Sequence, residues 1–281
     1  MTAEAMQPSY WQRQYNPRVA IADSQRYFDA WRDRAAQTRR RLAARLNIAY
    51  GPGERERLDL FSRHEGADSG TLVFIHGGYW RAFGKEDFSW VADEFVPRGI
   101  SVAVLSYPLM PYAGLPTIRR SISRAIEHLT TELLDVAERA KLVVVGHSAG
   151  AHLAAQYVAS SVPPSPRFAP EAVIGVSGLY DLLPVHCAGN LAVAGSNPGE
   201  LYEASPLYSL PPERSVVLVV VGADESREFQ RQSERLVDAW EPRVCGYLRV
   251  PQRNHFSVID DLTDERSELF RKVMGFFGDK R

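Results

Sequence analysis

Short apolar runs alternate along the chain with longer segments in which apolar residues recur at helical spacing. The runs are four to seven residues long and rich in β-branched side chains, which is typical of buried strands. They lie at Thr71–Ile75, Ile100–Leu105, Leu142–Val145, Val173–Val176, Ser215–Val221 and Gly246–Val250. The longer segments predict helices over Phe83–Pro97, Pro116–Ala140, a stretch after Gly150 that reaches Ser160, Ser226–Trp240 and Asp260–Phe277.

The first part of the chain has a different pattern. Residues 1–20 contain scattered aromatic side chains and prolines, which suggests an arm lying on a folded domain. Ser24–Leu46 has apolar residues on one helical face and predicts a helix. Asn47–Tyr50 and Arg57–Phe61 then alternate between apolar and polar residues around a Gly-Pro-Gly turn, which predicts two antiparallel strands.

Strands that alternate with helices predict an α/β fold with a mostly parallel central sheet and helices on both faces. We expect an N-terminal arm and helix over residues 1–46, packed on a single α/β domain over residues 47–281. Ligands of such sheets bind outside the carboxyl ends of the strands. The candidate functional residues are therefore those that directly follow each apolar run.

The run Leu142–Val145 leads into a G-x-S-x-G motif centred on Ser148, and a helical segment follows. Strand, G-x-S-x-G and helix in this order predict a nucleophile elbow, a sharp turn that exposes the serine Oγ above the sheet. Glycine is expected at Gly146 and Gly150 because side chains there would collide with neighbouring backbone. We therefore interpret Ser148 as a catalytic nucleophile.

A serine hydroxyl needs a base to take its proton and a carboxylate to orient that base. In a sheet of this type the three residues occur in the order Ser, acid, His. Of the seven histidines in the sequence, His255 is the one that follows both Ser148 and a candidate acid. The acid should come directly after Ser215–Val221, where Asp224 and Glu225 are adjacent. The residue types and their position after the strand leave both Asp224 and Glu225 open as the acid.

An oxyanion hole needs backbone N–H groups from the residue after the nucleophile and from an earlier strand-end loop. Ala149 provides the first, and we assign the others to Gly78 and Tyr79 in the loop His76-Gly77-Gly78-Tyr79-Trp80. Aromatic residues on strand-end loops predict a pocket that binds substrate, with Trp80, Tyr180 and Phe256 as lining residues. Asp181 comes before the expected acid position, so we interpret it as a helix cap or turn residue.

Composition narrows the function classes. The formal net charge of −1 provides no electrostatic footprint for nucleic acid, and no apolar stretch has the length of a membrane span. Cys187 and Cys245 form neither a disulfide framework nor a metal-ligand pattern, and no nucleotide-binding or zinc motif occurs. We expect a cytoplasmic enzyme that uses a small-molecule substrate without metal or cofactor. The sequence allows a homodimer without requiring one.

The H-G-G-x-W loop and the G-H-S-A-G elbow together resemble the kynurenine formamidase (arylformamidase) branch of the α/β-hydrolases. The likeness extends to Tyr15-Asn16-Pro17-Arg18, Ser177-Gly178-Leu179-Tyr180-Asp181, Glu225-Ser226-Arg227-Glu228-Phe229 and Asn254-His255-Phe256, and so covers nearly the whole chain. It implies the α/β-hydrolase fold and places the triad acid at Glu225, where many relatives have Asp. Asp224 remains the fallback.

The resemblance implies a serine hydrolase acting on N-formyl-L-kynurenine or a related aryl formamide, through a formyl-serine intermediate. A carboxylesterase or amidase for another small ester or amide is the first alternative. A ligand-binding protein without catalysis is the second, although such proteins often lose a triad residue. Ser148, Glu225 and His255 are all present in this chain.

Overall fold

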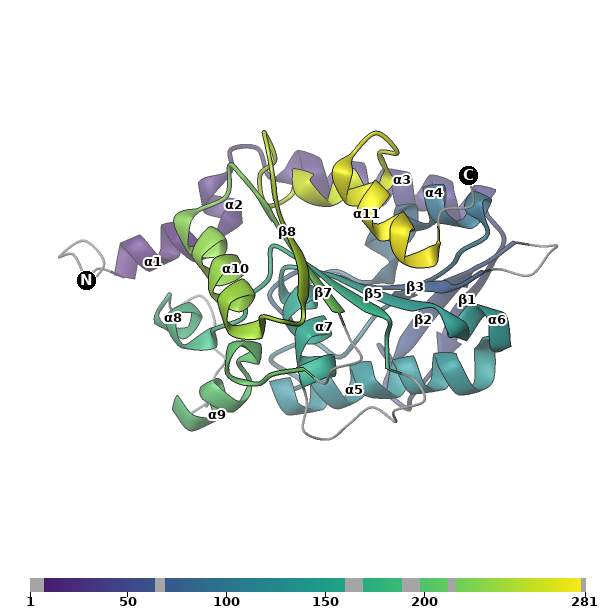
Figure 1. The fold of residues 1–281 in the computed structure, drawn as a ribbon, viewed down its shortest axis with the longest axis horizontal. Helices are drawn as coiled ribbons and strands as arrows, with labels where there is room; N and C mark the ends of the chain where they lie inside the picture. The colour runs from purple at the N-terminus through teal and green to yellow at the C-terminus, as the bar shows by residue number, and fades with distance from the viewer. Residues whose placement is uncertain (1–7, 64–68, 160–168, 189–197, 212–215, 279–281) are drawn as a thin grey trace.

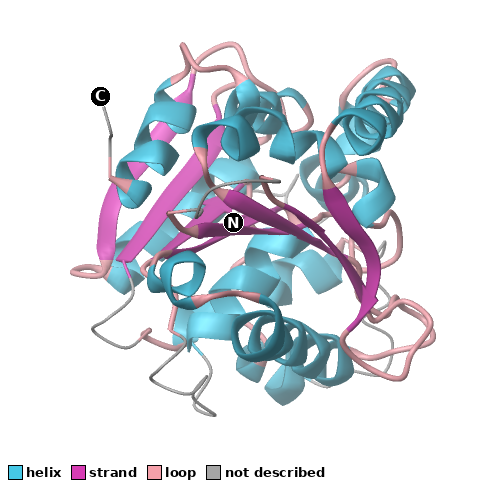
Figure 2. Cartoon of the chain, turned by 90° about the vertical axis from the view of Figure 1, so that its right-hand side faces the viewer, coloured by secondary structure: helices cyan, strands magenta, loops and turns pink. Residues whose placement is uncertain are grey.

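Eight strands among the described residues form one sheet at the centre of the computed structural model (Figure 1). The structure describes residues 8–63, 69–159, 169–188, 198–211 and 216–278. The strands are β1 (Ala44–Ala49), β2 (Arg57–Phe61), β3 (Thr71–Ile75), β4 (Ser101–Leu105), β5 (Leu142–His147), β6 (Ala172–Val176), β7 (Val216–Gly222) and β8 (Val244–Val250). Their order is β1-β2-β4-β3-β5-β6-β7-β8, and Figure 2 shows the twist of the sheet.

The sheet is mostly parallel, as predicted. β1 pairs with β2 and β2 pairs with β4 in antiparallel orientation, while the pairs from β4 through β8 are parallel. Every residue of β3, β4, β5 and β6 is buried, which explains why these strands read as continuous apolar runs. The ends of these strands meet at one edge of the sheet, where the predicted site residues follow.

Helices cover both faces of the sheet and divide the core into two apolar clusters (Figure 1). One face is covered by α3 (Gln25–Arg41), α4 (Ala92–Phe95) and α11 (Glu268–Phe277). The other is covered by α5 (Leu115–His128), α7 (Ala149–Ala159) and α10 (Arg227–Trp240). The predicted arrangement of helices on both faces is therefore confirmed.

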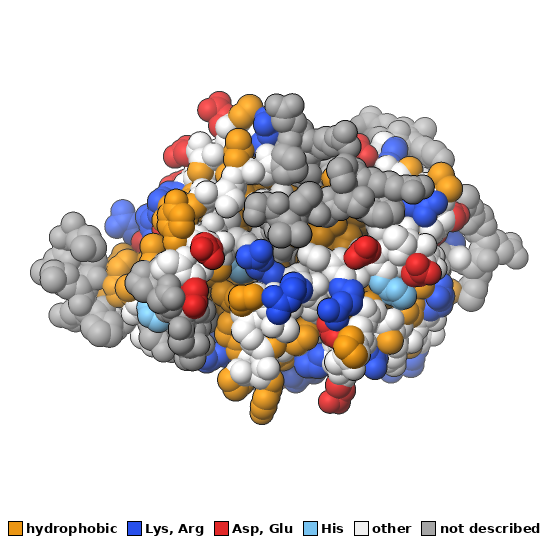
Figure 3. Space-filling model, turned by 90° about the horizontal axis from the view of Figure 1, so that it is seen from below, with side chains coloured by type: hydrophobic (Ala, Val, Ile, Leu, Met, Phe, Trp, Pro, Cys, Tyr) orange, Lys and Arg blue, Asp and Glu red, His pale blue; other side chains and the backbone are white. Residues whose placement is uncertain are grey.

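Helix α5 illustrates how patterning selects the buried face. Its apolar residues pack inward at helical spacing, whereas Arg120 and Arg124 lie on the outer side. Figure 3, which views the molecule from the side of α5, shows basic, acidic and hydrophobic side chains interspersed on this face. Helix α7 is different because all its residues are buried. It lies beneath the nucleophile elbow and packs on β5 and β6.

The predicted helix over Phe83–Pro97 is wrong. This segment instead forms 3₁₀ turns at Lys85–Asp87, Ser89–Val91 and Val96–Arg98, with the short α4 between the last two. The sequence resembles a helix because it is rich in apolar residues. Most of these are buried on all sides, however, and Pro97 provides no N–H for a continuous helix.

Two other predicted helices are interrupted. Helix α5 passes into a π turn at Leu129–Leu133, and Asp135 then caps α6 (Val136–Ala140) in a capping box with Glu138. The closing helix begins late, because Ser257–Thr263 forms a 3₁₀ helix and Ser267 caps α11. Polar capping side chains inside a long apolar pattern caused both errors.

The N-terminal arm forms α1 (Pro8–Tyr15) and α2 (Pro17–Ala20), which precede α3. The predicted helix to Leu46 extends too far, since β1 begins at Ala44. The division into residues 1–46 and 47–281 stays a prediction. Residues 1–7 and the predicted end points Ser160 and Ser215 lie outside the described residues.

Candidate active site

Ser148 stands on a sharp turn between β5 and α7. Its φ is +55°, in the left-handed region that costs a non-glycine residue about 1–3 kcal/mol. A Cβ on Gly146 would lie 2.2 Å from the Gly150 carbonyl oxygen, and one on Gly150 would lie 2.0 Å from that of Ile75. Both glycines therefore allow the close backbone approach that the elbow requires, as the sequence predicted.

A chain of hydrogen bonds links three predicted residues. His255 Nε2 lies 3.0 Å from Ser148 Oγ, and His255 Nδ1 lies 2.7 Å from Glu225 Oε2. Glu225 follows β7 and His255 follows β8, so the topology brings them together from positions far apart in the sequence. All three side chains are buried. The carboxylate accepts a hydrogen bond from Nδ1–H, and in this tautomer Nε2 faces the serine hydroxyl as an acceptor.

The structure distinguishes the two adjacent acids. The second oxygen of Glu225, Oε1, accepts hydrogen bonds from Ser177 Oγ at 2.5 Å and from the Gly222 N–H at 2.7 Å. Asp224 is exposed, and its N–H donates to the Arg253 carbonyl. Glu225 is thus the acid that faces His255. Sequence reasoning missed the part of Ser177, although this residue directly follows β6 at the same sheet edge.

Two further histidines lie at the ends of β5 and β3 and do not belong to this chain of hydrogen bonds. His147 Nε2 donates to the His255 carbonyl at 2.8 Å, which fixes the loop that carries His255. Burial keeps the pKa of His147 well below its ordinary value, and the neighbouring His255 lowers it further. The His76 ring stacks on Tyr107, and burial lowers its pKa to about 4. Both rings are therefore neutral near pH 7.

The predicted oxyanion loop lies against the serine. Gly78, Tyr79 and Trp80 have φ values of +101°, +53° and +56°, so the backbone turns sharply at the end of β3. Gly78, Tyr79 and Ser148 line the same cavity. Ala149 is the first residue of α7, where N–H groups have no partner inside the helix. The three predicted donors are thus all in segments that meet at Ser148.

A cavity of about 300 Å³ opens beside Ser148 and His255. Phe256 lines it, as predicted, but Trp80 and Tyr180 do not. Trp80 is fully buried with its ring edge-on to His152, and Tyr180 is fully buried below the end of β6. These aromatic residues turn into the core rather than toward the site. The wall residues that sequence reasoning missed are Asn16, Pro17, Arg18, Trp31, Gly77, Arg81, Ala82, Phe83, Phe88 and His147.

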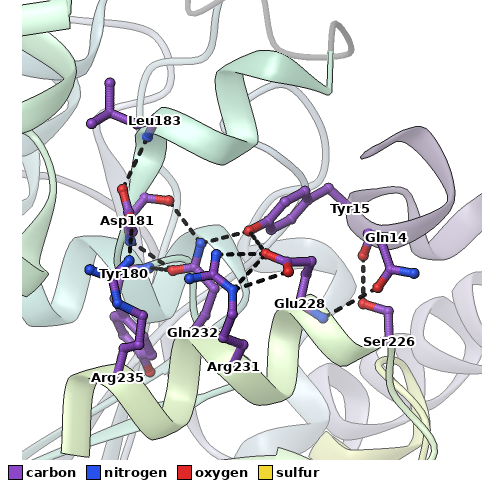
Figure 4. Close-up of polar contacts among 10 residues, drawn as sticks. All are labelled: Gln14, Tyr15, Tyr180, Asp181, Leu183, Ser226, Glu228, Arg231, Gln232 and Arg235. Carbon is purple, nitrogen blue, oxygen red and sulfur yellow. Dashed lines mark hydrogen bonds and ion pairs between the residues drawn. The ribbon is translucent and has the colours of Figure 1, made fainter. Parts of the chain in front are cut away.

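The N-terminal arm reaches this cavity because a buried polar network anchors it to α10 (Figure 4). The Tyr15 hydroxyl donates to Glu228 Oε2 at 2.7 Å and accepts from Gln232 Nε2 at 3.0 Å. Ser226 Oγ donates to the Gln14 carbonyl at 2.6 Å. Burial and the Glu228 carboxylate raise the pKa of Tyr15. The network holds the residues after Tyr15 at the cavity wall.

The same network continues to the end of β6. Gln232 Oε1 accepts hydrogen bonds of 2.7 Å from the N–H groups of Tyr180 and Asp181 (Figure 4). Asp181 caps α8 (Leu182–Cys187) by accepting from the Leu183 N–H, and it pairs with Arg235. The interpretation of Asp181 as a cap is therefore confirmed.

The described residues contain neither a group of three or more His, Cys, Asp and Glu side chains arranged to hold a metal ion nor a helix long and apolar enough to span a membrane.

The model of the BD-FAE family matches residues 58–236. The chain belongs to the BD-FAE family. Kynurenine formamidase from Salmo salar is 29% identical to this BD-FAE protein over 252 residues, which cover 82% of each chain. Kynurenine formamidase from Danio rerio is 25% identical over 295 residues, which cover 99% of this chain and 97% of the relative.

Among solved structures, a protein from a Silicibacter species that is provisionally named a thioesterase aligns with a TM-score of 0.84. It is 32% identical in sequence, and the alignment covers 92% of this BD-FAE protein and 97% of the neighbour. The predicted α/β-hydrolase fold and the predicted kinship with the kynurenine formamidase branch are both confirmed. The protein is a hydrolase acting on small substrates.

Proposed function

We propose that this hydrolase cleaves N-formyl-L-kynurenine, or a related aryl formamide, to an arylamine and formate. The observation that carries the proposal is the buried hydrogen-bonded chain from Ser148 through His255 to Glu225, which opens into an aromatic-walled cavity. Similarity to kynurenine formamidases over most of the chain supports the choice of acyl group.

In the first half of the reaction, Ser148 Oγ attacks the formyl carbon while His255 Nε2 takes the hydroxyl proton. Glu225 stabilises the resulting imidazolium through its contact with Nδ1. The C–N bond then breaks as His255 returns that proton to the departing aniline nitrogen. In the second half, His255 activates water, which attacks the formyl-serine and releases formate with a free Ser148.

Negative charge develops on the formyl oxygen during both attacks. We assign its stabilisation to the N–H groups of Ala149, Gly78 and Tyr79, whose segments meet at the serine. One such donor contributes about 3 kcal/mol to transition-state stabilisation. Tyr79 occupies the position of the third glycine in the lipase H-G-G-G loop, and its added bulk suits a formyl or other small acyl group.

The cavity suits an aryl leaving group. Its volume of about 300 Å³ is at the lower end for small-molecule sites, and Trp31, Phe83, Phe88 and Phe256 provide aromatic walls. Aromatic side chains favour an aryl ring by stacking or edge-to-face contact, at about 0.5–1.5 kcal/mol per pair.

A carboxylesterase or thioesterase activity is the second candidate, favoured by the provisional name of the Silicibacter neighbour. Purified protein should be compared on N-formyl-L-kynurenine and on a generic acetyl ester. A kcat/KM for the formamide well above that for the ester supports the proposal. An equal or lower value would reject the formamidase assignment in favour of the esterase.

The serine mechanism has its own test. Replacement of Ser148 by Ala should reduce kcat by about 10⁴–10⁶-fold and abolish labelling by a fluorophosphonate. Near-normal activity of this variant would refute the mechanism. Failure of the folded wild-type protein to label would instead favour a ligand-binding protein without catalysis.

A further inference from the structure

Among the described residues, the cavity wall carries basic side chains and no acidic ones. Among the described residues that line it, the charged side chains other than His are Arg18 and Arg81, and none is acidic. The carboxylate of the triad, on Glu225, already forms hydrogen bonds with His255, Ser177 and Gly222. A wall with fixed positive charge and no acidic side chain favours a ligand that carries negative charge.

Arg18 differs from Arg34 of α3 and from Arg253 in the loop that carries His255. Arg34 pairs with Asp260 at 2.8 Å, and Arg253 pairs with Asp261 at 2.7 Å. Arg18 has neither an ion pair nor a hydrogen bond from its side chain to any other residue that the structure describes. Arg18 is exposed, and the N–H donors of its guanidinium are therefore available to a ligand.

Aromatic rings orient this guanidinium. Its central carbon lies 4.6 Å from the ring centroid of Phe28 and 5.6 Å from that of Phe83, which itself lines the cavity. Stacking on aromatic faces uses the plane of the guanidinium and leaves its edge N–H groups free. Those groups match the two oxygens of a carboxylate in bidentate geometry.

The backbone that carries Arg18 is also fixed. Arg18 follows Tyr15 by three residues, and Tyr15 is anchored to Glu228 and Gln232 of α10. Pro17, in the first turn of α2, is buried. A pre-organised cation loses little conformational entropy when a ligand binds.

We infer that Arg18 is a specificity-determining residue that binds a carboxylate on the leaving-group side of the substrate. The inference rests on the proposed formamidase function, because a formyl group has no room for a carboxylate and leaves the amine portion to carry it. The substrate class is thereby narrowed to aryl formamides whose amine portion bears a carboxylate.

The test compares N-formyl-L-kynurenine with its carboxamide, a formamide that keeps the α-amino group and lacks only the carboxylate charge. The variant Arg18→Met keeps an apolar stem for packing on Phe28 but removes the charge. We expect the ratio of kcat/KM between the two substrates to fall by about 10- to 100-fold, mainly through KM. Arg18→Lys should have an intermediate ratio. It keeps the positive charge but loses the paired N–H groups with which a guanidinium binds both oxygens of a carboxylate.

The matched control is Arg120→Met on the outer side of α5, which should change neither kcat/KM nor the ratio. Rising salt should lower kcat/KM for N-formyl-L-kynurenine in the wild type and much less in Arg18→Met. An equal loss on both substrates in Arg18→Met would overturn the inference, since it would show that Arg18 acts through packing alone.

Failure of the formamidase proposal can be distinguished from failure of the inference about Arg18. If the wild type hydrolyses neither formamide, the formamidase proposal fails. The same comparison is then made with two acetyl esters of phenols, one bearing a propanoate side chain and the other a propyl group. A selective loss on the propanoate ester in Arg18→Met would uphold the carboxylate subsite, and an equal loss on both esters would reject it.

Discussion

The Ser177 hydroxyl donates a 2.5 Å hydrogen bond to Oε1 of Glu225. The Gly222 N–H donates to the same oxygen, which leaves Oε2 to face His255. Two donors on one oxygen fix the rotation of the carboxylate about its last side-chain bond. We therefore expect Ser177 to be a positioning residue that acts on His255 through Glu225.

Ser177→Ala should lower kcat by about tenfold with little change in KM, because the carboxylate loses one of two orienting donors. Steady-state kinetics on N-formyl-L-kynurenine measures both constants. The matched control is Ser233→Ala, which removes a buried hydroxyl that bonds to its own helix at Phe229. An unchanged kcat in Ser177→Ala would contradict the positioning role.

Substitutions of the two adjacent acids, Glu225 and Asp224, should have very different effects on kcat. Glu225→Gln should reduce kcat by about 10³–10⁴-fold, because an amide neither stabilises the imidazolium nor enforces the required tautomer of His255. Asp224→Asn should leave kcat within about twofold, since Asp224 is exposed. The reverse order of effects would move the acid to Asp224.

Loss of the contacts that anchor the N-terminal arm should lower the stability of the fold and also weaken substrate binding. Tyr15→Phe removes a buried hydroxyl and leaves Glu228 and Gln232 each without one hydrogen bond. The free energy of unfolding should fall by about 1–3 kcal/mol, and KM should rise because residues 16–18 form part of the cavity wall. Urea titration and kinetics measure the two effects.

Tyr10→Phe is the control for the arm, because Tyr10 contacts Trp11 through its ring edge and lies outside the anchoring network. It should change neither the midpoint of unfolding nor KM. A Tyr15→Phe variant with wild-type stability would show that the network contributes little to docking of the arm.

Buried histidines predict loss of stability in acid. Burial lowers the pKa of His152 to about 4 from an ordinary value of 6.5, and it also lowers the pKa of His76 to about 4. Between these values the unfolded chain binds more protons than the folded one, so stability is complete above pH 6.5 and falls as pH decreases toward 4. Each histidine adds a slope of about 1.4 kcal/mol per pH unit within this window.

Urea unfolding at several pH values between 4.5 and 7 measures this slope. These values cover most of the window from about 4 to 6.5 and extend to the plateau above it. His152→Gln should reduce the slope by about one histidine's share. His186→Gln should leave it unchanged, because His186 is exposed. A wild-type stability that is flat across this range would contradict the prediction.

Sequence patterns predicted the elements that depend on local order. The buried strands β3 to β7 lie within two residues of their predicted bounds, because β-branched runs buried on both faces leave a strong local signal. Chain order selected His255, and the resemblance selected Glu225, with which His255 shares a hydrogen bond in the structure.

The cavity walls could not be predicted in the same way. Trp80 and Tyr180 occupy strand-end loops like Phe256, but the direction of each side chain depends on backbone angles and neighbours that no periodicity encodes. Trp31 and Phe83 reach the site through tertiary packing of α3 and an irregular segment. Arg18 reaches it because Tyr15 docks on a helix more than 200 residues away in the sequence.

The cavity has walls from both ends of the chain: residues 16–18 lie on one side, and His255 and Phe256 on another. During synthesis the first wall is made long before the second, and the arm has no α10 to dock on until residues 227–240 have emerged. A complete substrate site therefore exists only after nearly the whole chain has folded. Catalytic activity consequently reports on the integrity of both the arm at residues 16–18 and the loop at His255 and Phe256. A nick after Tyr15 should impair substrate selection while the central sheet remains folded.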